Sequence, residues 1–235
     1  ARLAFHRSDP STFAGNISGT GAVAQIGGGT TILTGNNSYS GGTTVSAGTL
    51  RVNGSLSADS DVTIASAATI GGAGTIGGNV VASLGGRAAP GNSIGTLAIN
   101  GDYTWNGANA AVSTHLFELS NSNGTSDRLV IGGWLLKGSG STFRFDFQGT
   151  GRAGYYTLAT FLDTTFTAAD FSYVNLPNGY TGTFSVFRDS VRFTVVAPDV
   201  AATVNLSGLH RTYDGSPKSV SVTTNPSGLA THVTY

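Results

Sequence analysis

A serine between glycines is the first feature of the sequence that could support catalysis. The segment Gly91-Asn92-Ser93-Ile94-Gly95 matches G-x-S-x-G, a pattern in which a sharp turn between a strand and a helix exposes a nucleophilic serine. Residues 96–101 favour a strand and then a turn, and the nearest downstream base, His115, has no evident orienting partner. We therefore interpret the segment as a corner turn and not as a hydrolase site.

A second glycine pattern could bind a phosphate. Residues 72–77 match G-x-G-x-x-G, whose anion site is the N-terminus of a following helix. Residues 79–82 favour a strand, so the pattern predicts glycines at tight corners and no nucleotide site.

Paired carboxylates would be needed to cleave a polysaccharide. Asp59 and Asp61 are the only acidic residues close together in the sequence, and the chain holds 12 acidic residues in all. Ca²⁺ prefers six to eight oxygen ligands, and no Asp recurs at a fixed step. The pair is interpreted as solvated side chains at a turn, and a polysaccharide lyase or hydrolase remains the alternative.

The remaining reactive side chains are scattered. The spacing of the four histidines does not suit zinc: they are His6, His115, His210 and His232. Lys137 or Lys218 could form an amide cross-link with an asparagine, but that chemistry needs a buried lysine and a catalytic acid, and Glu118 is the only glutamate. No catalytic, cofactor-binding or metal-binding residue is assigned, and no cofactor is expected.

The two tryptophans lie where the composition of the sequence changes. Trp105 and Trp134 could be platforms on which sugars stack, and the Ser/Thr/Asn-rich surface could also bind carbohydrate. Packing in a core or a cap is the favoured interpretation for both rings. A carbohydrate-binding module without catalysis therefore stays open as a further alternative.

The composition restricts the elements that can position these residues. Glycine contributes 35 of 235 residues, about twice the usual share of roughly 7%. Only 10% of residues are charged, and the formal net charge is zero, which disfavours nucleic-acid binding. No apolar run is long enough to span a bilayer as a helix, and the absence of cysteine excludes a disulfide framework. We read the sequence as an excerpt from a longer chain.

Short β-prone runs alternate with Gly, Asn and Ser over the first hundred residues. Gly-Thr pairs at Gly29, Gly48, Gly74 and Gly95 suggest a repeat of about 20 residues, which predicts stacked coils. Glycine and asparagine are expected to supply the left-handed backbone at the corners. The predicted strands are 22–26, 30–33, 43–45, 49–52, 61–64, 79–81 and 96–99.

Two strings carry a resemblance to a known family. Residues 33–52, LTGNNSYSGGTTVSAGTLRV, resemble the autotransporter-associated β-strand repeat. Residues 90–103, PGNSIGTLAINGDY, followed by Asp127-Arg128-Leu129-Val130-Ile131, resemble the end of autotransporter passenger β-helices. The resemblance covers roughly residues 15–197 and implies a right-handed parallel β-helix and a type V secretion route.

The rest of the sequence differs in texture. Aromatic residues gather between 106 and 197, and Phe143, Phe145 and Phe147 share one face of a predicted strand at 142–147. A second alternating run spans 183–195, and this region is expected to close the coil stack. After residue 197, the string YDGSPKSV at 213–220 resembles the MBG (mainly β-grasp) module, of which only a part is expected.

Together these observations predict an all-β chain with parallel β-helix coils at 1–105, a β-helix end and aromatic cap at 106–197, and a partial MBG-like module at 198–235. The expected function is a non-enzymatic, surface-exposed or secreted passenger segment that acts as an adhesin, stalk or scaffold. The expected partners are host or environmental glycans or protein surfaces, or a second copy of the chain. No nucleic acid and no direct membrane insertion are expected, and attachment to the outer membrane would need a part of the chain not present here.

Overall fold

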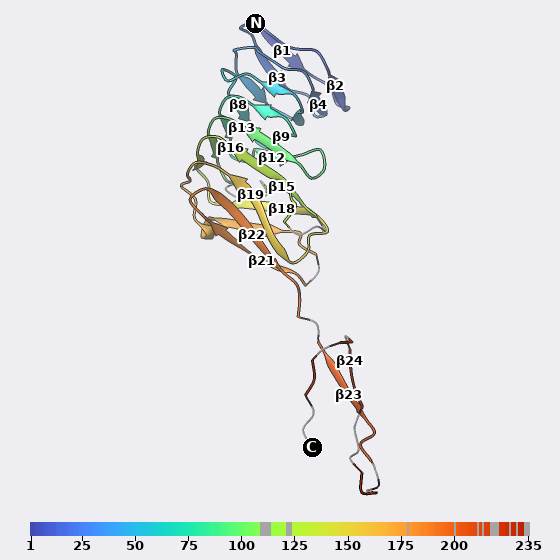
Figure 1. Cartoon of the computed structure of the whole chain (residues 1–235). Coiled ribbons are helices and arrows are strands. Elements are labelled where there is room, and N and C mark those ends of the chain that lie inside the picture. The colour runs from blue at the N-terminus through green and yellow to red at the C-terminus, as the bar shows by residue number, and fades with distance from the viewer. Residues whose placement is uncertain are drawn as a thin grey trace. The chain divides into compact units, whose positions relative to one another are not determined.

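The chain divides into two compact units, Ala1–Ala197 and Pro198–Tyr235. The structure, a computed structural model, describes residues 1–108, 114–120, 124–177, 179–199, 201–210, 212, 214–216, 221–225, 227–228 and 230–232. In the first unit, short strands follow one another in coils that stack from the N-terminus onward (Figure 1).

The strands of the first unit form four sheets. The first sheet runs in the spatial order β1 (Arg2–Phe5), β3 (Ala22–Gln25), β5 (Thr43–Val45), β8 (Val62–Ile64), β11 (Val80–Ala82), β14 (Tyr103–Trp105) and β17 (Leu135–Lys137). The second runs β7 (Ser55–Leu56), β10 (Thr75–Ile76), β13 (Thr96–Ile99), β16 (Arg128–Ile131), β19 (Gly154–Thr160), β22 (Ser190–Val196) and β21 (Thr181–Val186). The third runs β2 (Ser11–Phe13), β4 (Thr30–Leu33), β6 (Thr49–Val52), β9 (Thr69–Gly72) and β12 (Arg87–Pro90). The fourth runs β15 (Thr114–Leu119), β18 (Phe143–Gly149) and β20 (Phe171–Val174).

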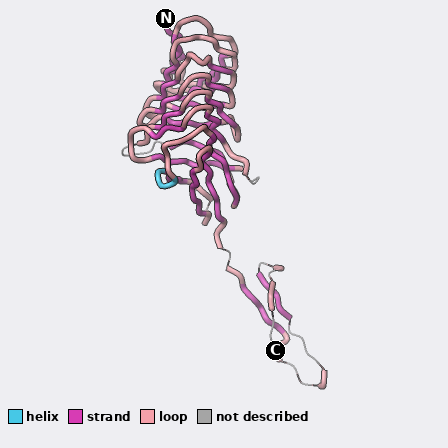
Figure 2. The backbone as a smooth tube through the Cα atoms, turned by 60° about the vertical axis from the view of Figure 1, so that its left-hand side comes forward, coloured by secondary structure: helices cyan, strands magenta, loops and turns pink. Residues whose placement is uncertain are grey.

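From β5 onward, each coil visits three sheets in turn. One coil consists of β5, β6 and β7, and the next repeats the path with β8, β9 and β10. All pairings in these coils are parallel, and the strands stack in columns (Figure 2). The hydrogen bonds therefore run from coil to coil, which explains how strands of two to four residues are stable here. This arrangement confirms the predicted all-β parallel β-helix.

Side chains of equivalent positions stack into the core. In the first sheet, Val45 pairs with Ile64, Ile64 with Ala82, and Ala82 with Trp105. All four side chains point inward and are buried. Because side chains alternate along a strand, the residue between two buried positions faces solvent, as Thr63 does in β8. The inward-facing residues of successive coils thus form a continuous apolar column.

Polar side chains at one corner join successive coils. The Asp61 carboxylate accepts the Asn79 N–H at 2.7 Å, and the Asn79 side-chain oxygen accepts the Asp102 N–H at 2.9 Å. The Asp102 carboxylate accepts the Trp134 N–H at 2.7 Å. Each of these acceptors satisfies a backbone donor that the bend leaves without a strand partner.

The expected role of asparagine at corners is corrected by this ladder. Among the described residues, Ala67 and Asn175 are the only non-glycine residues with a positive φ. Asparagine therefore supports the coil corners mainly through side-chain hydrogen bonds to the next coil, and left-handed backbone is supplied mostly by glycine.

At another corner, glycine is required because successive coils approach closely. A Cβ on Gly54 would lie 2.1 Å from the Gly35 carbonyl oxygen, and one on Gly74 would lie 2.2 Å from the Gly54 carbonyl oxygen. Both distances are far below van der Waals contact, so any larger residue would push the coils apart.

The Gly-Thr pairs of the predicted repeat occupy two different positions in the coil. Thr30 pairs with Thr49, so Gly29 and Gly48 are equivalent corners. Thr75 lies in the second sheet and pairs with Ala98, so Gly74 and Gly95 do not continue that series. The longest apparent step, from Gly48 to Gly74, crosses from one sheet to another.

Aromatic residues fill the C-terminal end of the coil stack. The face predicted for β18 is confirmed, since Phe143, Phe145 and Phe147 are all buried. The rings of Phe147 and Phe193 lie 4.5 Å apart between centroids, and those of Phe184 and Phe193 lie 4.7 Å apart. The run predicted at 183–195 is split into β21 and β22, which form an antiparallel hairpin next to β19.

The second unit contains one described pair of strands. β23 (Thr203–Ser207) pairs with β24 (Ser221–Asn225) in an antiparallel ladder. Tyr213, Pro217, Lys218 and Val220, which belong to the string that resembles an MBG module, lie outside the described residues.

Candidate functional site

A surface cavity beside the 91–95 turn gathers more polar side chains than its surroundings. Its volume is about 360 Å³. The residues around it come from the third and fourth sheets, from the turn that follows β12 and from the position just before β16. They are Arg51, Ala89, Pro90, Gly91, Asn92, Ser93, Leu116, Glu118, Asp127 and Gln148.

The lack of bulk in the third sheet creates the cavity. Arg51 of β6 pairs with Gly71 of β9, and Gly71 pairs with Ala89 of β12. The Arg51 side chain therefore extends across small residues and donates to the Gly91 carbonyl at 3.3 Å and to the Asn92 side-chain oxygen at 3.1 Å.

Asp127 fastens the turn to the coil. Its two carboxylate oxygens accept the N–H groups of Gly95 and Glu118, each at 2.8 Å. Burial raises the pKa of Asp127 to about 7, against the effect of these two hydrogen bonds, and the nearby Glu118 carboxylate raises it further. Each Asp127 oxygen thus accepts one backbone N–H, and the side chain holds the turn in place.

The serine of the G-x-S-x-G pattern has a carboxylate neighbour and not a histidine. Ser93 Oγ donates to Glu118 Oε2 at 3.2 Å. The segment lies between strands β12 and β13, so the predicted corner turn is confirmed. His115 is buried in the core, where its Nε2 lies 2.5 Å from the Tyr103 hydroxyl and its ring stacks on Trp105.

Burial also sets the protonation of this core pair. It lowers the pKa of His115 to about 3 and raises the pKa of Tyr103. The Ala88 N–H donates to His115 Nδ1 at 3.4 Å, so the imidazole is neutral and donates from Nε2 to the tyrosine oxygen. His115 is therefore a core residue with satisfied nitrogens.

The other residues that the sequence offered as candidate site residues have structural positions. Gly72 and Gly74 stand at a corner between β9 and β10, which confirms the interpretation of the G-x-G-x-x-G pattern. Asp59 is exposed, and the Asp61 carboxylate belongs to the corner ladder. The pair of carboxylates that the fold brings together is Glu118 and Asp127, which the sequence did not indicate because their proximity depends on strand register.

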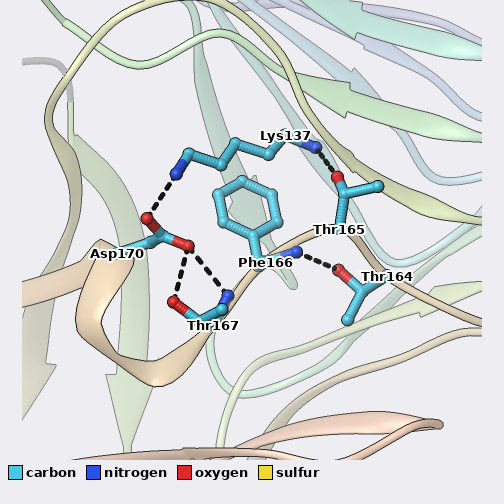
Figure 3. Close-up of polar contacts among 6 residues, drawn as sticks. All are labelled: Lys137, Thr164, Thr165, Phe166, Thr167 and Asp170. Carbon is cyan, nitrogen blue, oxygen red and sulfur yellow. Dashed lines mark hydrogen bonds and ion pairs between the residues drawn. The ribbon is translucent and has the colours of Figure 1, made fainter.

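The tryptophans and Lys137 differ in their surroundings. Trp105 packs in the core as expected, whereas 43% of Trp134 is exposed, so packing does not account for that ring. Lys137 forms an ion pair with Asp170 (Figure 3). Lys218 lies outside the described residues.

Figure 3 shows the polar contacts between Lys137 of β17 and the segment 164–170. The Lys137 N–H donates to Thr165 Oγ1 at 2.7 Å, and Thr164 Oγ1 donates to the Leu135 carbonyl at 2.7 Å. The Asp170 carboxylate accepts the Thr167 N–H at 2.8 Å, next to the short 3₁₀ helix η1 (Ala168–Asp170). The edge of β17 is thus paired and not open.

Two further features bear on the class of protein. Within the part of the chain that the structure describes, no three His, Asp or Glu side chains gather as a metal site. No described helix is long and apolar enough to cross a membrane.

Comparison with known families adds to this geometry. The model of a passenger-associated-transport-repeat matches residues 23–52, which run from β3 to the end of β6. Residues 23–52 are therefore similar to a passenger-associated-transport-repeat. The model of an MBG domain matches residues 202–235. Both matches confirm the resemblances seen in the sequence, and a search of the curated proteins found no match.

Proposed function

We propose that this chain is a non-catalytic segment of an autotransporter-like passenger, which acts as a stalk or scaffold at the bacterial cell surface. The single observation that carries the proposal is the in-register stacking of coils over a closed C-terminal end. A stack of this kind gives a projecting body in which each coil contacts only its neighbours.

The pairing pattern suits a chain that folds as it leaves the cell. Each strand of a coil is bonded to the coil before and the coil after, as β8 is to β5 and β11. A new coil therefore needs only its neighbour as a template. This supports a type V secretion route, with attachment to the outer membrane through a part of the chain that lies beyond this sequence.

The competing proposal is a polysaccharide-active β-helix enzyme. General acid–base catalysis needs a carboxyl group with an oxygen that is free to reach the substrate. Both oxygens of Asp127 accept backbone N–H groups that hold the turn, and Glu118 accepts from Ser93, so both carboxyl groups have structural partners. These contacts support the non-catalytic proposal.

Two measurements test the proposed function. Antibodies raised against residues 1–197 should label intact cells that express the parent protein, and labelling only after permeabilisation would overturn surface display. The purified chain should release no reducing sugar from pectin, alginate or similar polymers. Release that Glu118→Gln abolishes would establish the enzyme instead.

A further inference from the structure

The cavity beside the 91–95 turn has polar groups that the fold itself does not use. Glu118 accepts from Ser93 through Oε2, and Gln148 donates from Nε2 to Asp146 at 2.8 Å. Within the described part of the chain, Glu118 Oε1 and Gln148 Oε1 have no hydrogen-bond partner. Both are acceptors, and both residues line the cavity.

Strand register places these two acceptors side by side. Glu118 of β15 pairs directly with Gln148 of β18, so their side chains leave the sheet on one face. Opposite them, Arg51 uses one nitrogen for Gly91 and Asn92 and retains further N–H donors. Acceptors on one wall and donors on the other match adjacent hydroxyl groups, because each hydroxyl both donates and accepts.

The floor between the two walls is apolar and small. It is formed by Ala89, Pro90 and Leu116, of which Leu116 and Ala89 are half-buried. Such a floor suits the C–H face of a sugar ring, and ligand sites commonly combine an apolar floor with a few convergent polar groups.

The charge of the cavity points to a neutral ligand. The positive charge of the Arg51 guanidinium is offset by the negative charge of the Glu118 carboxylate. Asp127 is an acid, so it leaves no net positive charge in the cavity. A uronic acid or a sulfated sugar would place its own negative charge beside Glu118. No aromatic residue is among the lining residues, so the affinity expected for a single sugar is weak, in the millimolar range.

We propose that the cavity beside the 91–95 turn binds one neutral hexose unit of a glycan. This recognition goes beyond the proposed stalk or scaffold role and does not depend on it. It would give a non-catalytic passenger a defined glycan contact on the outer face of the third and fourth sheets.

Saturation-transfer NMR on the full chain tests the proposal. The probes are D-glucose, D-galactose, D-mannose, N-acetyl-D-glucosamine and D-glucuronate, each at millimolar concentration. At least one neutral sugar should give a signal, and that signal should exceed the one from glucuronate. Absence of a signal for all four neutral sugars, or a stronger signal from glucuronate, would overturn the proposal.

Matched variants locate the binding. Ala89→Leu fills the floor of the cavity and should abolish the signal, whereas Thr63→Leu places the same side chain on an exposed position of β8 and should leave it unchanged. Gln148→Ala, at an exposed position, should reduce the signal at least threefold even if Ala89→Leu does not fold. A signal that both cavity variants retain would show that the sugar binds elsewhere.

Discussion

Two buried ionisable residues respond to pH in opposite directions. The pKa of Asp127 is about 7 in the folded chain, above the value of roughly 3.9 expected when unfolded. The pKa of His115 is about 3 in the folded chain, below the value of roughly 6.5 expected when unfolded. As the pH falls, the folded chain therefore protonates Asp127 at a higher pH than the unfolded chain does, and His115 at a lower pH. The first effect stabilises the fold in acid and the second destabilises it, so the two partly cancel.

The titration of Asp127 predicts a measurable pH effect. Between about pH 7 and pH 4, folded Asp127 binds a proton that the unfolded chain does not bind, so this group stabilises the fold increasingly as the pH falls. Urea unfolding from pH 7.5 to 4.5 should show wild type gaining stability relative to Asp127→Asn.

The exposed Asp59→Asn is the control for the pH series. Its stability should follow that of wild type at every pH. A difference between wild type and Asp127→Asn that stays constant with pH would contradict a raised pKa. In that case the two N–H groups at 2.8 Å would have kept the carboxylate ionised.

The Tyr103–His115 pair predicts strong coupling between two substitutions. Tyr103→Phe or His115→Phe alone leaves one buried polar group without its partner, and each should lower the free energy of unfolding by about 1–3 kcal/mol. The double variant should cost less than the sum, because no polar partner then remains. Urea unfolding at pH 7.5 measures the cycle.

If the two single substitutions lower the free energy of unfolding additively, the Tyr103–His115 contact contributes no coupling energy. The double variant supplies a second check, since it removes the group that titrates at His115. Its stability should fall less steeply than that of wild type as the pH drops below about 6.5.

At the scale of elements, the corners decide how closely the coils stack. Gly54→Ala should lower the free energy of unfolding by about 1–3 kcal/mol, because its Cβ would overlap the Gly35 carbonyl oxygen and force the backbone apart. Gly28→Ala is the matched control, since no atom lies within 4 Å of its Cβ position. It should change stability by less than about 0.5 kcal/mol. Thermal unfolding of both variants distinguishes them, and equal losses would contradict the role of close approach.

The sequence predicted the strands that carry two or more β-branched or large apolar residues. Residues 30–33, 43–45 and 49–52 have the predicted bounds, because alternation and flanking glycines mark both ends. In the second sheet, β13 was also predicted with its observed bounds, whereas β7 and β10 were missed, since they contain two residues each and hold no periodic pattern. Their pairing is set by neighbouring coils, which a single segment does not reveal.

The candidate site was less predictable than the coils. The string at 90–103 drew attention to the turn, but nothing local links it to Arg51 of β6 or Gln148 of β18. Those side chains converge through the register of two sheets and the small residues Gly71 and Ala89. Sequence patterns identify faces of strands, whereas a cavity depends on which coils are neighbours.

At the scale of the whole first unit, its described ends differ in how they are covered. At the N-terminal end, β1 and β2 carry mostly exposed or half-buried side chains. At the C-terminal end, β22 and β21 pair with β19, and their rings pack against β18 and β20. The aromatic contacts, each worth about 0.5–1.5 kcal/mol beyond area burial, concentrate stability at this end.

Truncation tests this asymmetry. A chain ending at residue 197 should keep the cooperative unfolding of the first unit, because residues 198–235 form a separate unit. A chain ending at residue 180 loses β21 and β22, which exposes Phe147 and the edge of β19, so it should aggregate or unfold at a much lower urea concentration. Removal of residues 1–20 is the matched control at the other end and should lower the unfolding midpoint far less. Equal unfolding midpoints for the chains ending at 180 and 197 would show that the aromatic end does not stabilise the stack. The stability of the folded first unit would then have to come from the coils themselves.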